Sequence, residues 1–138
     1  MGGEATEGTH TRSLSLSLSL THTHDITHTL TQQADDVDDV TPTVGYSTQM
    51  VTASKVKYTA YDMSGQGRYR NLWEAQYATT DAIIFVVDAA DDVRLVIVKD
   101  ELDAMLQHED LASRPDVPIL FFANKMDLDD RMDTAAIS

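Results

Sequence analysis

Cysteine and basic residues are what this sequence lacks most. The chain has no cysteine, so disulfides, thiolate metal sites and cysteine nucleophiles are ruled out, and a reducing, cytoplasmic compartment is the expected location. Lys and Arg number 10 against 23 Asp and Glu, which gives a net charge of -13. Because nucleic-acid binding needs clustered Lys and Arg to replace counterions along the phosphates, this balance argues against a nucleic-acid partner.

Long apolar runs are also missing. The longest, Ala82 to Val87, has the length of a strand and is far shorter than the roughly 18 residues that suggest a membrane span. The N-terminus lacks the continuous apolar centre of a signal peptide, because serine interrupts leucine throughout Ser13 to Leu20. Gly2 fits the loose pattern for N-myristoylation, and one acyl chain there would support marginal, peripheral membrane association.

The first 40 residues differ in composition from the rest. Ser-Leu dipeptides fill Ser13 to Leu20 and Thr-His pairs recur around them, as translated dinucleotide repeats would produce. We interpret residues 1–40 as a low-complexity, disordered tail. Two alternatives stay open, since four of the five histidines lie before residue 29 and could bind a metal, and the strict alternation of Ser13 to Leu20 also fits a strand.

Residues 41–138 have the periodicity of an α/β domain. Tyr46 to Val51 and Lys55 to Tyr61 predict an antiparallel hairpin. The run Ala82 to Val87 is apolar on both faces, which predicts a strand of a parallel sheet buried between helical layers. Val117 to Ala123 predicts the next buried strand.

A helix is expected between these two strands. Asp91 or Asp92 would cap its start. Apolar residues at helical spacing then form a broad stripe, which we expect to pack on the sheet. The stripe consists of Val93, Leu95, Ile97, Val98, Leu102, Met105 and Leu106.

Three polar segments suggest a ligand site. Asp62 to Gln66 follows the hairpin, where an acid faces the ligand crevice of an α/β sheet, a glycine lets backbone approach a phosphate and a glutamine can orient water. Thr43 offers a hydroxyl to a metal and an N–H to a phosphate. Asn124 to Asp127 ends the second buried strand, and a carboxylate there can accept both N–H donors of guanine's Watson–Crick edge. Each segment taken alone also fits an ordinary loop.

In their order and spacing these segments resemble the Arf and Arf-like family of small GTPases. The resemblance runs from Thr41 to about Leu128 and is strongest in Asp62 to Glu74 and Pro118 to Leu128, where the sequence is most similar to the branch linked to the ciliary BBSome coat. Ser64 stands where most Arf proteins have glycine, as in that branch. The resemblance implies a partial P-loop NTPase domain of the small-GTPase type, with a mostly parallel sheet and an antiparallel interswitch hairpin.

The resemblance also implies ligands and residue roles. GTP or GDP and Mg²⁺ would be bound, with Thr43 and Asp62 at the metal and Gln66 as the catalytic residue that positions the attacking water. The nucleotide contacts implied by the family are those of Thr43, Gly65, Asn124, Lys125 and Asp127.

Partners follow from the same resemblance. An exchange factor, a GTPase-activating protein and an effector such as a BBSome-type coat are expected, at the ciliary base or membrane periphery. The effector would contact an aromatic surface, for which core packing is the alternative reading of Trp73. That surface would consist of Tyr46, Tyr61, Trp73 and Tyr77.

The sequence departs from the family in its phosphate-binding part. No Gly-x-x-x-x-Gly-Lys-Ser/Thr occurs, although the N–H groups and lysine of that loop hold the phosphates. The family's last base-contacting loop is expected beyond Ser138. We also expect the central strand to be missing and its neighbours to have unpaired edges, because Ser13 to Leu20 would bury up to four hydroxyls there.

Three hypotheses about function therefore stand. The first is a GTP-binding switch of ciliary trafficking in which this chain is defective in nucleotide binding. The second is a nucleotide-free interaction module that presents the hairpin and the helix of Trp73 to a partner such as a coat subunit. The third is a gene-model fragment with no function of its own.

Overall fold

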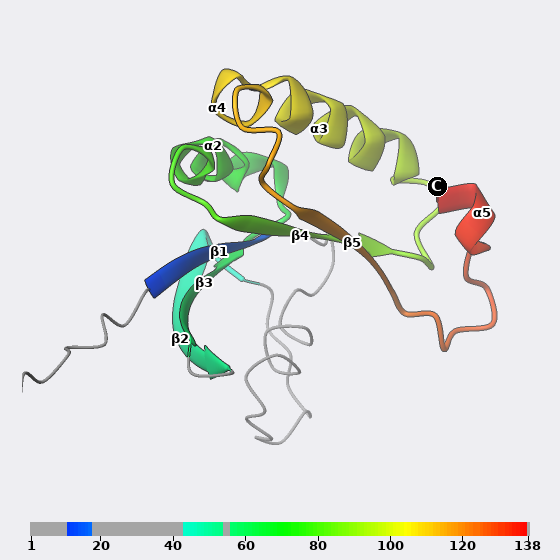
Figure 1. Cartoon of the computed structure of the whole chain (residues 1–138). Helices are drawn as coiled ribbons and strands as arrows, with labels where there is room; N and C mark the ends of the chain where they lie inside the picture. The colour runs from blue at the N-terminus through cyan, green and yellow to red at the C-terminus, as the bar shows by residue number, and fades with distance from the viewer. Residues whose placement is uncertain (1–10, 18–42, 54–55, 138) are drawn as a thin grey trace, which may run out of the picture.

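A five-stranded sheet forms the centre of the protein (Figure 1). The computed structural model describes residues 11–17, 43–53 and 56–137. The strand order is β2-β3-β1-β4-β5, with β2 antiparallel to β3 and every other pair parallel. This arrangement confirms the predicted mostly parallel sheet with one antiparallel hairpin. The strands are β1 (Thr11–Ser17), β2 (Tyr46–Ala53), β3 (Val56–Met63), β4 (Ala82–Asp88) and β5 (Ile119–Asn124).

The central position of the sheet is occupied by β1. It pairs with β3 over Thr11–Ser17 and with β4 over Leu14–Ser17. The expectation that β3 and β4 have unpaired edges is therefore wrong. That expectation counted the cost of burying serine hydroxyls but not the cost of leaving the backbone N–H and C=O groups of two neighbouring strands without partners. The remainder of Ser13 to Leu20 and the segment up to residue 40 lie outside the described residues, so the predicted tail stays a prediction.

Three of the helices cover one face of the sheet (Figure 1). They are α2, α3 and α4, while α5 lies near the start of α3 and a short 3₁₀ helix, η1, precedes α2. An ion pair between Arg70 and Glu101 joins the start of α2 to α3. The bounds are η1 (Gly67–Tyr69), α2 (Asn71–Tyr77), α3 (Leu95–Gln107), α4 (Glu109–Ala112) and α5 (Thr134–Ile137).

The core lies between the helices and β4. As predicted, β4 is buried along nearly its whole length. Residues two apart on a strand share a face, so its odd-numbered apolar residues point to the helices. The core cluster is Met63, Trp73, Tyr77, Ile83, Phe85, Val87, Met105, Leu111 and Val117.

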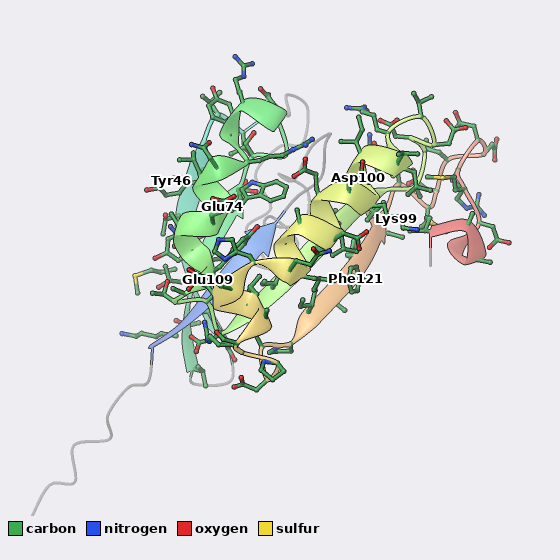
Figure 2. The ribbon with its side chains drawn as sticks, turned by 90° about the horizontal axis from the view of Figure 1, so that it is seen from above. Tyr46, Glu74, Lys99, Asp100, Glu109 and Phe121 are labelled. Atoms are coloured by element: carbon green, nitrogen blue, oxygen red, sulfur yellow. The ribbon has the colours of Figure 1, made fainter. Side chains whose placement is uncertain are left out.

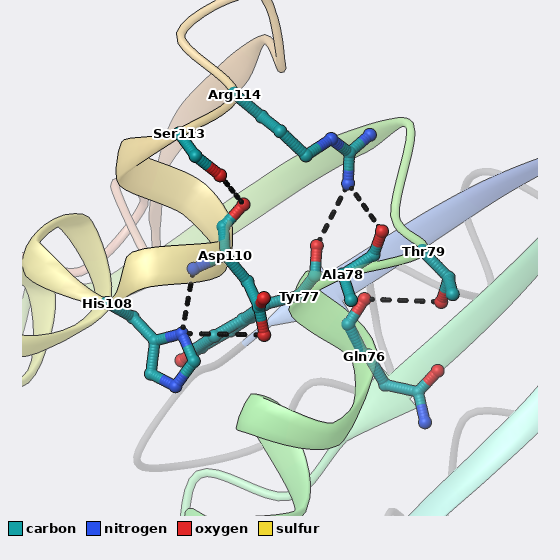
Figure 3. A network of polar contacts seen from close by, with 8 residues as sticks. All are labelled: Gln76, Tyr77, Ala78, Thr79, His108, Asp110, Ser113 and Arg114. Atoms are coloured by element: carbon teal, nitrogen blue, oxygen red, sulfur yellow. Dashed lines mark hydrogen bonds and ion pairs between the residues drawn. The ribbon is translucent and has the colours of Figure 1, made fainter.

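Arg114 holds the end of α2 in place (Figure 3). Its Nη1 donates to the carbonyl oxygens of Tyr77 and Ala78, each at 3.0 Å, and its Nη2 donates to that of Thr80 at 2.7 Å. The last carbonyls of a helix lack partners within the helix, and a guanidinium satisfies several of them at once. This one side chain thus contacts three carbonyls in the connection from α2 to β4.

The apolar stripe of α3 that packs on the sheet is narrower than the sequence predicted. Asp91 Oδ1 accepts a hydrogen bond from the backbone N–H of Arg94 at 3.2 Å. The predicted cap at Asp91 or Asp92 is nevertheless wrong, because α3 begins at Leu95 and its N-cap residue is Arg94, which makes no side-chain capping bond. Val93 is 84% exposed, and Ile97 and Leu106 are also exposed. Only one side of α3 faces the sheet, and the packed set is Leu95, Val98, Leu102 and Met105.

Burial of the last strand was predicted wrongly. Leu120, Phe121 and Phe122 are 56%, 54% and 42% exposed. In the described part of the chain β5 is the outermost strand and pairs only with β4. Figure 2 shows Phe121 on this outer strand beside α3. An apolar run identifies such a strand but does not tell whether a neighbour covers it.

Candidate functional site

The predicted ligand residues meet at one edge of the sheet. Parallel strands end on the same side, so the carboxyl ends of β1, β3, β4 and β5 lie together (Figure 1). Asp88, the last residue of β4, is directly paired with Asn124, the last residue of β5. Asp62 lies near the end of β3, in register with Leu16. The sheet thus gathers the candidate groups that the sequence places 62 residues apart, from Asp62 to Asn124.

Thr43 and Asp62 form the first half of the site. The Thr43 hydroxyl donates to Asp62 Oδ2 at 3.0 Å. Asp62 is 3% exposed, and its buried Oδ1 has no hydrogen-bond partner among the described residues. A second contact, from the N–H of Ser64 to the carbonyl of Gly45 at 2.9 Å, ties the Thr43 loop to the exit of β3. A buried carboxylate oxygen without a partner costs free energy unless something else satisfies it.

This pair fits a magnesium ion. Mg²⁺ prefers oxygen ligands and is usually held by one or two protein groups, with water and phosphate oxygens completing the octahedron. A hydroxyl and a buried carboxylate with a spare oxygen are such groups. Among the described residues no cluster of three or more His, Cys, Asp or Glu could hold a metal, and the tail histidines lie outside those residues.

Gln66 follows Gly65, which is buried. The Gln66 Oε1 accepts hydrogen bonds from Arg68 Nε at 3.0 Å and Nη2 at 2.8 Å. The Arg68 guanidinium also lies 5.2 Å from the centre of the Tyr69 ring. For Gln66 to orient a water molecule through Oε1, this contact with Arg68 has to open.

The second half of the site is the loop that begins at Asn124. Asn124 Oδ1 accepts from the N–H of Lys125 at 2.9 Å, while its buried Nδ2 has no hydrogen-bond partner in the part of the chain that the structure describes. Lys125 has a φ of 63°, the left-handed region that a residue with a side chain rarely adopts. Asp127 is exposed. The carboxylate predicted to recognise guanine is therefore accessible, next to a turn of fixed shape.

Sequence reasoning missed Asp88. Asp88 is 7% exposed, and its Oδ2 accepts from Lys125 Nζ at 2.8 Å. The signal was available, because Asp88 directly follows the predicted buried strand Ala82 to Val87, as Asp62 directly follows the predicted hairpin. What the sequence does not show is that β4 and β5 are neighbours with matching ends.

The predicted aromatic surface is only half present. Tyr46 is 49% exposed, Tyr61 is half-buried, and their ring centres are 6.4 Å apart. Trp73 and Tyr77 are each 5% exposed, and Trp73 Nε1 donates to the carbonyl of Ser64 at 3.0 Å. The core alternative for Trp73 is confirmed, and the prediction that Tyr77 contacts a partner does not fit its burial.

An apolar groove of about 670 Å³ lies between α3, β5 and α5. Its lining is mostly aliphatic and aromatic and contains none of the predicted site residues. The edge that carries Asp62 and Asn124 is the candidate site, because the groups there have the chemistry of a metal and nucleotide site.

Comparison with known proteins agrees with this geometry. The sequence model of the ADP-ribosylation factor family matches residues 6–138, nearly the whole chain. The chain belongs to the ADP-ribosylation factor family. The match includes β1, the strand that composition alone assigned to a tail.

Two relatives give the level of similarity. ADP-ribosylation factor-like protein 6 of Danio rerio is 50% identical over 100 residues, which are 72% of this chain and 53% of that protein. The protein of the same name from Caenorhabditis briggsae is 39% identical over 99 residues, which are 72% of this chain and 52% of that protein. The chain thus spans about half the length of these relatives.

A solved structure gives the fold. The Arl6 BBS3 small GTPase from Trypanosoma brucei, with the bound nucleotide analogue GppNp, superposes with a TM-score of 0.76 and 37% sequence identity. The similarity covers 93% of this chain and 75% of that one. The fold of this chain is that of a small GTPase. In the part of the chain that the structure describes, no helix is long and apolar enough to cross a membrane.

Proposed function

We propose that this chain is part of an Arf-like GTP-binding switch that acts in ciliary membrane trafficking, and that its own nucleotide binding is weak. The observation that carries the proposal is the Thr43–Asp62 pair, whose spare Oδ1 lies at the same sheet edge as the loop that begins at Asn124. This edge therefore has groups suited to Mg²⁺ and groups suited to guanine. The proposal assigns the first set to the phosphate end of GTP and the second to its base.

Each residue has a defined task in this proposal. Thr43 and Asp62 hold Mg²⁺, which would supply charge neutralisation at the β- and γ-phosphates. The N–H of Gly65 donates to the γ-phosphate, and Gln66, once released by Arg68, orients the attacking water. A protein accelerates phosphoryl transfer mainly by positioning the reacting groups and by stabilising their charge. The rate of GTP hydrolysis should therefore depend on the geometry of these contacts.

The guanine end is recognised by the second half of the site. Asp127 accepts the two N–H donors of guanine, an arrangement that adenine does not offer. Asn124 and Lys125 keep the loop in shape beside it, through the 2.9 Å contact between Asn124 Oδ1 and the N–H of Lys125. A preference for GTP over ATP is the expected signature of this half.

The segment that follows β1 is poorly suited to bind phosphate. A phosphate-binding loop in this fold comes directly after such a strand and uses glycine, backbone N–H groups and a lysine. Residues 18–42 contain no glycine, lysine or arginine and have five aspartates, so their charge repels phosphate. Nanomolar affinity requires about -12 kcal/mol. A few charged hydrogen bonds of roughly 1.5–3 kcal/mol each, less an association cost of about 4–15 kcal/mol, do not reach it.

Calorimetric titration with Mg·GTP and Mg·ATP tests the proposal. We expect a dissociation constant for GTP no tighter than micromolar, together with weaker binding of ATP. Submicromolar GTP binding would show that residues 18–42 provide a phosphate site and would refute the weak binding. Equal affinity for the two nucleotides would refute the guanine site.

An interaction module that works without nucleotide is the second candidate. It is favoured by the exposed Tyr46 beside Tyr61 on the hairpin, a surface that does not depend on the nucleotide edge. We expect a BBSome-type coat to be retained by the nucleotide-free chain under this candidate and only by a GTP-loaded intact switch under the first. Tyr46→Ala should reduce retention in either case. Rapid proteolysis and poor solubility of residues 41–138 would instead favour a fragment with no function.

A further inference from the structure

We propose that Asp88 is a positioning residue for guanine recognition, acting through Lys125 on the loop that presents Asp127. The inference rests on the proposed function, because it assigns a role within the same site. Asp88 is 7% exposed and lies at the end of β4, opposite the last residue of β5. Both of its carboxylate oxygens are engaged, Oδ2 with Lys125 Nζ at 2.8 Å and Oδ1 with the N–H of Ala90 at 3.0 Å.

The loop has a backbone conformation that needs support. Lys125 has a φ of 63°, which is disfavoured for any residue with a Cβ and is retained only where surrounding contacts fix it. Among the described residues, three contacts of Lys125 support this conformation. The Lys125 N–H donates to Asn124 Oδ1 at 2.9 Å, its carbonyl accepts from the N–H of Leu128 at 3.2 Å, and its ammonium reaches Asp88. Of these, the contact with Asp88 is the one made to another strand.

Backbone contacts from the same strand end hold both sides of the loop. The N–H of Ala89 donates to the carbonyl of Asn124 at 3.0 Å, and the carbonyl of Ala89 accepts from the N–H of Met132 at 2.7 Å. Ala89 thus contacts both ends of the segment from Asn124 to Met132. Asp88, which precedes Ala89, adds a charge-assisted bond to Lys125, and such bonds are shorter and roughly twice as strong as neutral ones.

Asp88 acts through Lys125 and not by touching the ligand. Its side chain is nearly buried, whereas Asp127, two residues after Lys125, is exposed. Loss of the carboxylate would remove one of the contacts that hold Lys125 at positive φ, and a shift of the loop toward negative φ would displace Asp127 relative to the base. The effect should therefore fall on the choice of base more than on the phosphate end.

The test compares Asp88→Asn with Asp91→Asn in the full chain. Asp91 is a matched control, because it also accepts a backbone N–H and pairs with a cation, Arg94, but at the start of α3. Affinities for Mg·GTP and Mg·ATP are measured by NMR titration up to millimolar concentration. We expect Asp88→Asn to lower the preference for GTP over ATP about tenfold, the loss that follows from one charge-assisted contact, and Asp91→Asn to leave the preference unchanged.

The outcomes separate the two claims. If the unaltered chain does not prefer GTP, the proposed function fails and the inference fails with it. If the chain prefers GTP and Asp88→Asn weakens both nucleotides equally, Asp88 has only a structural role and the inference is overturned. A fall in the unfolding temperature alone, with the preference intact, also overturns it.

A double-mutant cycle keeps the test decisive if Asp88→Asn folds poorly. Lys125→Met removes the ammonium and keeps the stem, and combining it with Asp88→Asn leaves no unpaired buried charge. If Asp88 acts through Lys125, the double variant should show the same preference as Lys125→Met alone. A further loss of preference in the double variant would show that Asp88 acts by another route.

Discussion

At the scale of single residues, GTP hydrolysis would depend on Gln66. In the structure its Oε1 is held by two nitrogens of Arg68, both within 3.0 Å. Even when released, it can orient water only against a fixed γ-phosphate, and the segment after β1 lacks the residues that would fix one. We therefore expect Gln66→Leu to leave GTP hydrolysis by this chain at its background level, measured as phosphate release.

The matched control for this variant is Arg68→Leu, which frees Gln66 without removing it. Background turnover is expected there as well. A clear drop in phosphate release with Gln66→Leu, or a rise with Arg68→Leu, would show that a γ-phosphate is held in the productive position.

Tyr77 makes the stability of the fold depend on pH in the alkaline range. Burial, together with the negative charges of Glu74 and Glu101, raises the pKa of the Tyr77 hydroxyl above its ordinary value of 10.0. The unfolded chain then releases this proton at a lower pH than the folded chain, so the free energy of unfolding falls as pH rises above about 10, by up to ~1.4 kcal/mol per pH unit. Below that pH the contribution is complete.

Urea denaturation between pH 8 and pH 11 measures this effect. Tyr77→Phe should lose less stability over the range than the unaltered chain, because the titrating group is gone. Identical pH dependence of the two proteins would mean that Tyr77 is not buried as described.

Individual site residues were predictable where a strand end and a known chemistry coincide. Asp62 and Asn124 were identified in this way, and the structure places both at one edge. Asp88 was missed, since its importance comes from Lys125 on a neighbouring strand. Trp73 could not be assigned from sequence, because an aromatic side chain at helical spacing fits core and surface equally well until its neighbours are known.

At the scale of elements, β1 is where the prediction from the sequence and the structure differ most. Its alternation was noticed, but serine on one face argued against a central strand. The structure gives it seven residues paired with β3 and four with β4. Backbone pairing on both edges outweighs side-chain composition there, because unpaired N–H and C=O groups of two strands would otherwise be buried.

Hydrogen exchange tests the place of β1. We expect the amides of Thr11–Ser17 to be protected together with those of Ile83–Phe85, because the two strands share hydrogen bonds and should open as one unit. The hairpin of β2 and β3 serves as an internal reference. If the β1 amides exchanged at unprotected rates while those of the hairpin stayed protected, β1 would not be a strand of the sheet and would belong to the predicted tail.

The other elements show which sequence patterns are sufficient to predict an element and which are not sufficient to predict its burial. The hairpin was predicted from the alternation of its strands, and β4 from a fully apolar run of strand length. The burial of β5 and the width of the α3 stripe were overestimated, since both depend on which neighbours cover them. Leu120 and Val93 are apolar and exposed, and nothing local in the sequence distinguishes them from core residues.

At the scale of the whole molecule, the proposed nucleotide edge combines two parts that fit the proposal with one that departs from the family. The Thr43–Asp62 pair and the loop after Asn124 are in place. Between them, β1 ends at Ser17, where the family would continue into its phosphate-binding loop. We therefore expect this one segment to limit the affinity of the chain for nucleotide.

Exchanging that segment tests the claim most directly. Leu18 to Asp25 would be replaced by eight residues of the pattern Gly-x-x-x-x-Gly-Lys-Ser, and the dissociation constant for Mg·GTP would be measured by calorimetry beside the unaltered chain. A scrambled version of the same eight residues is the control for composition and charge. If the claim is right, the ordered replacement binds at least about 100-fold more tightly, a gain of about 2.8 kcal/mol, and the scrambled one does not. Equal affinity of all three proteins would contradict it.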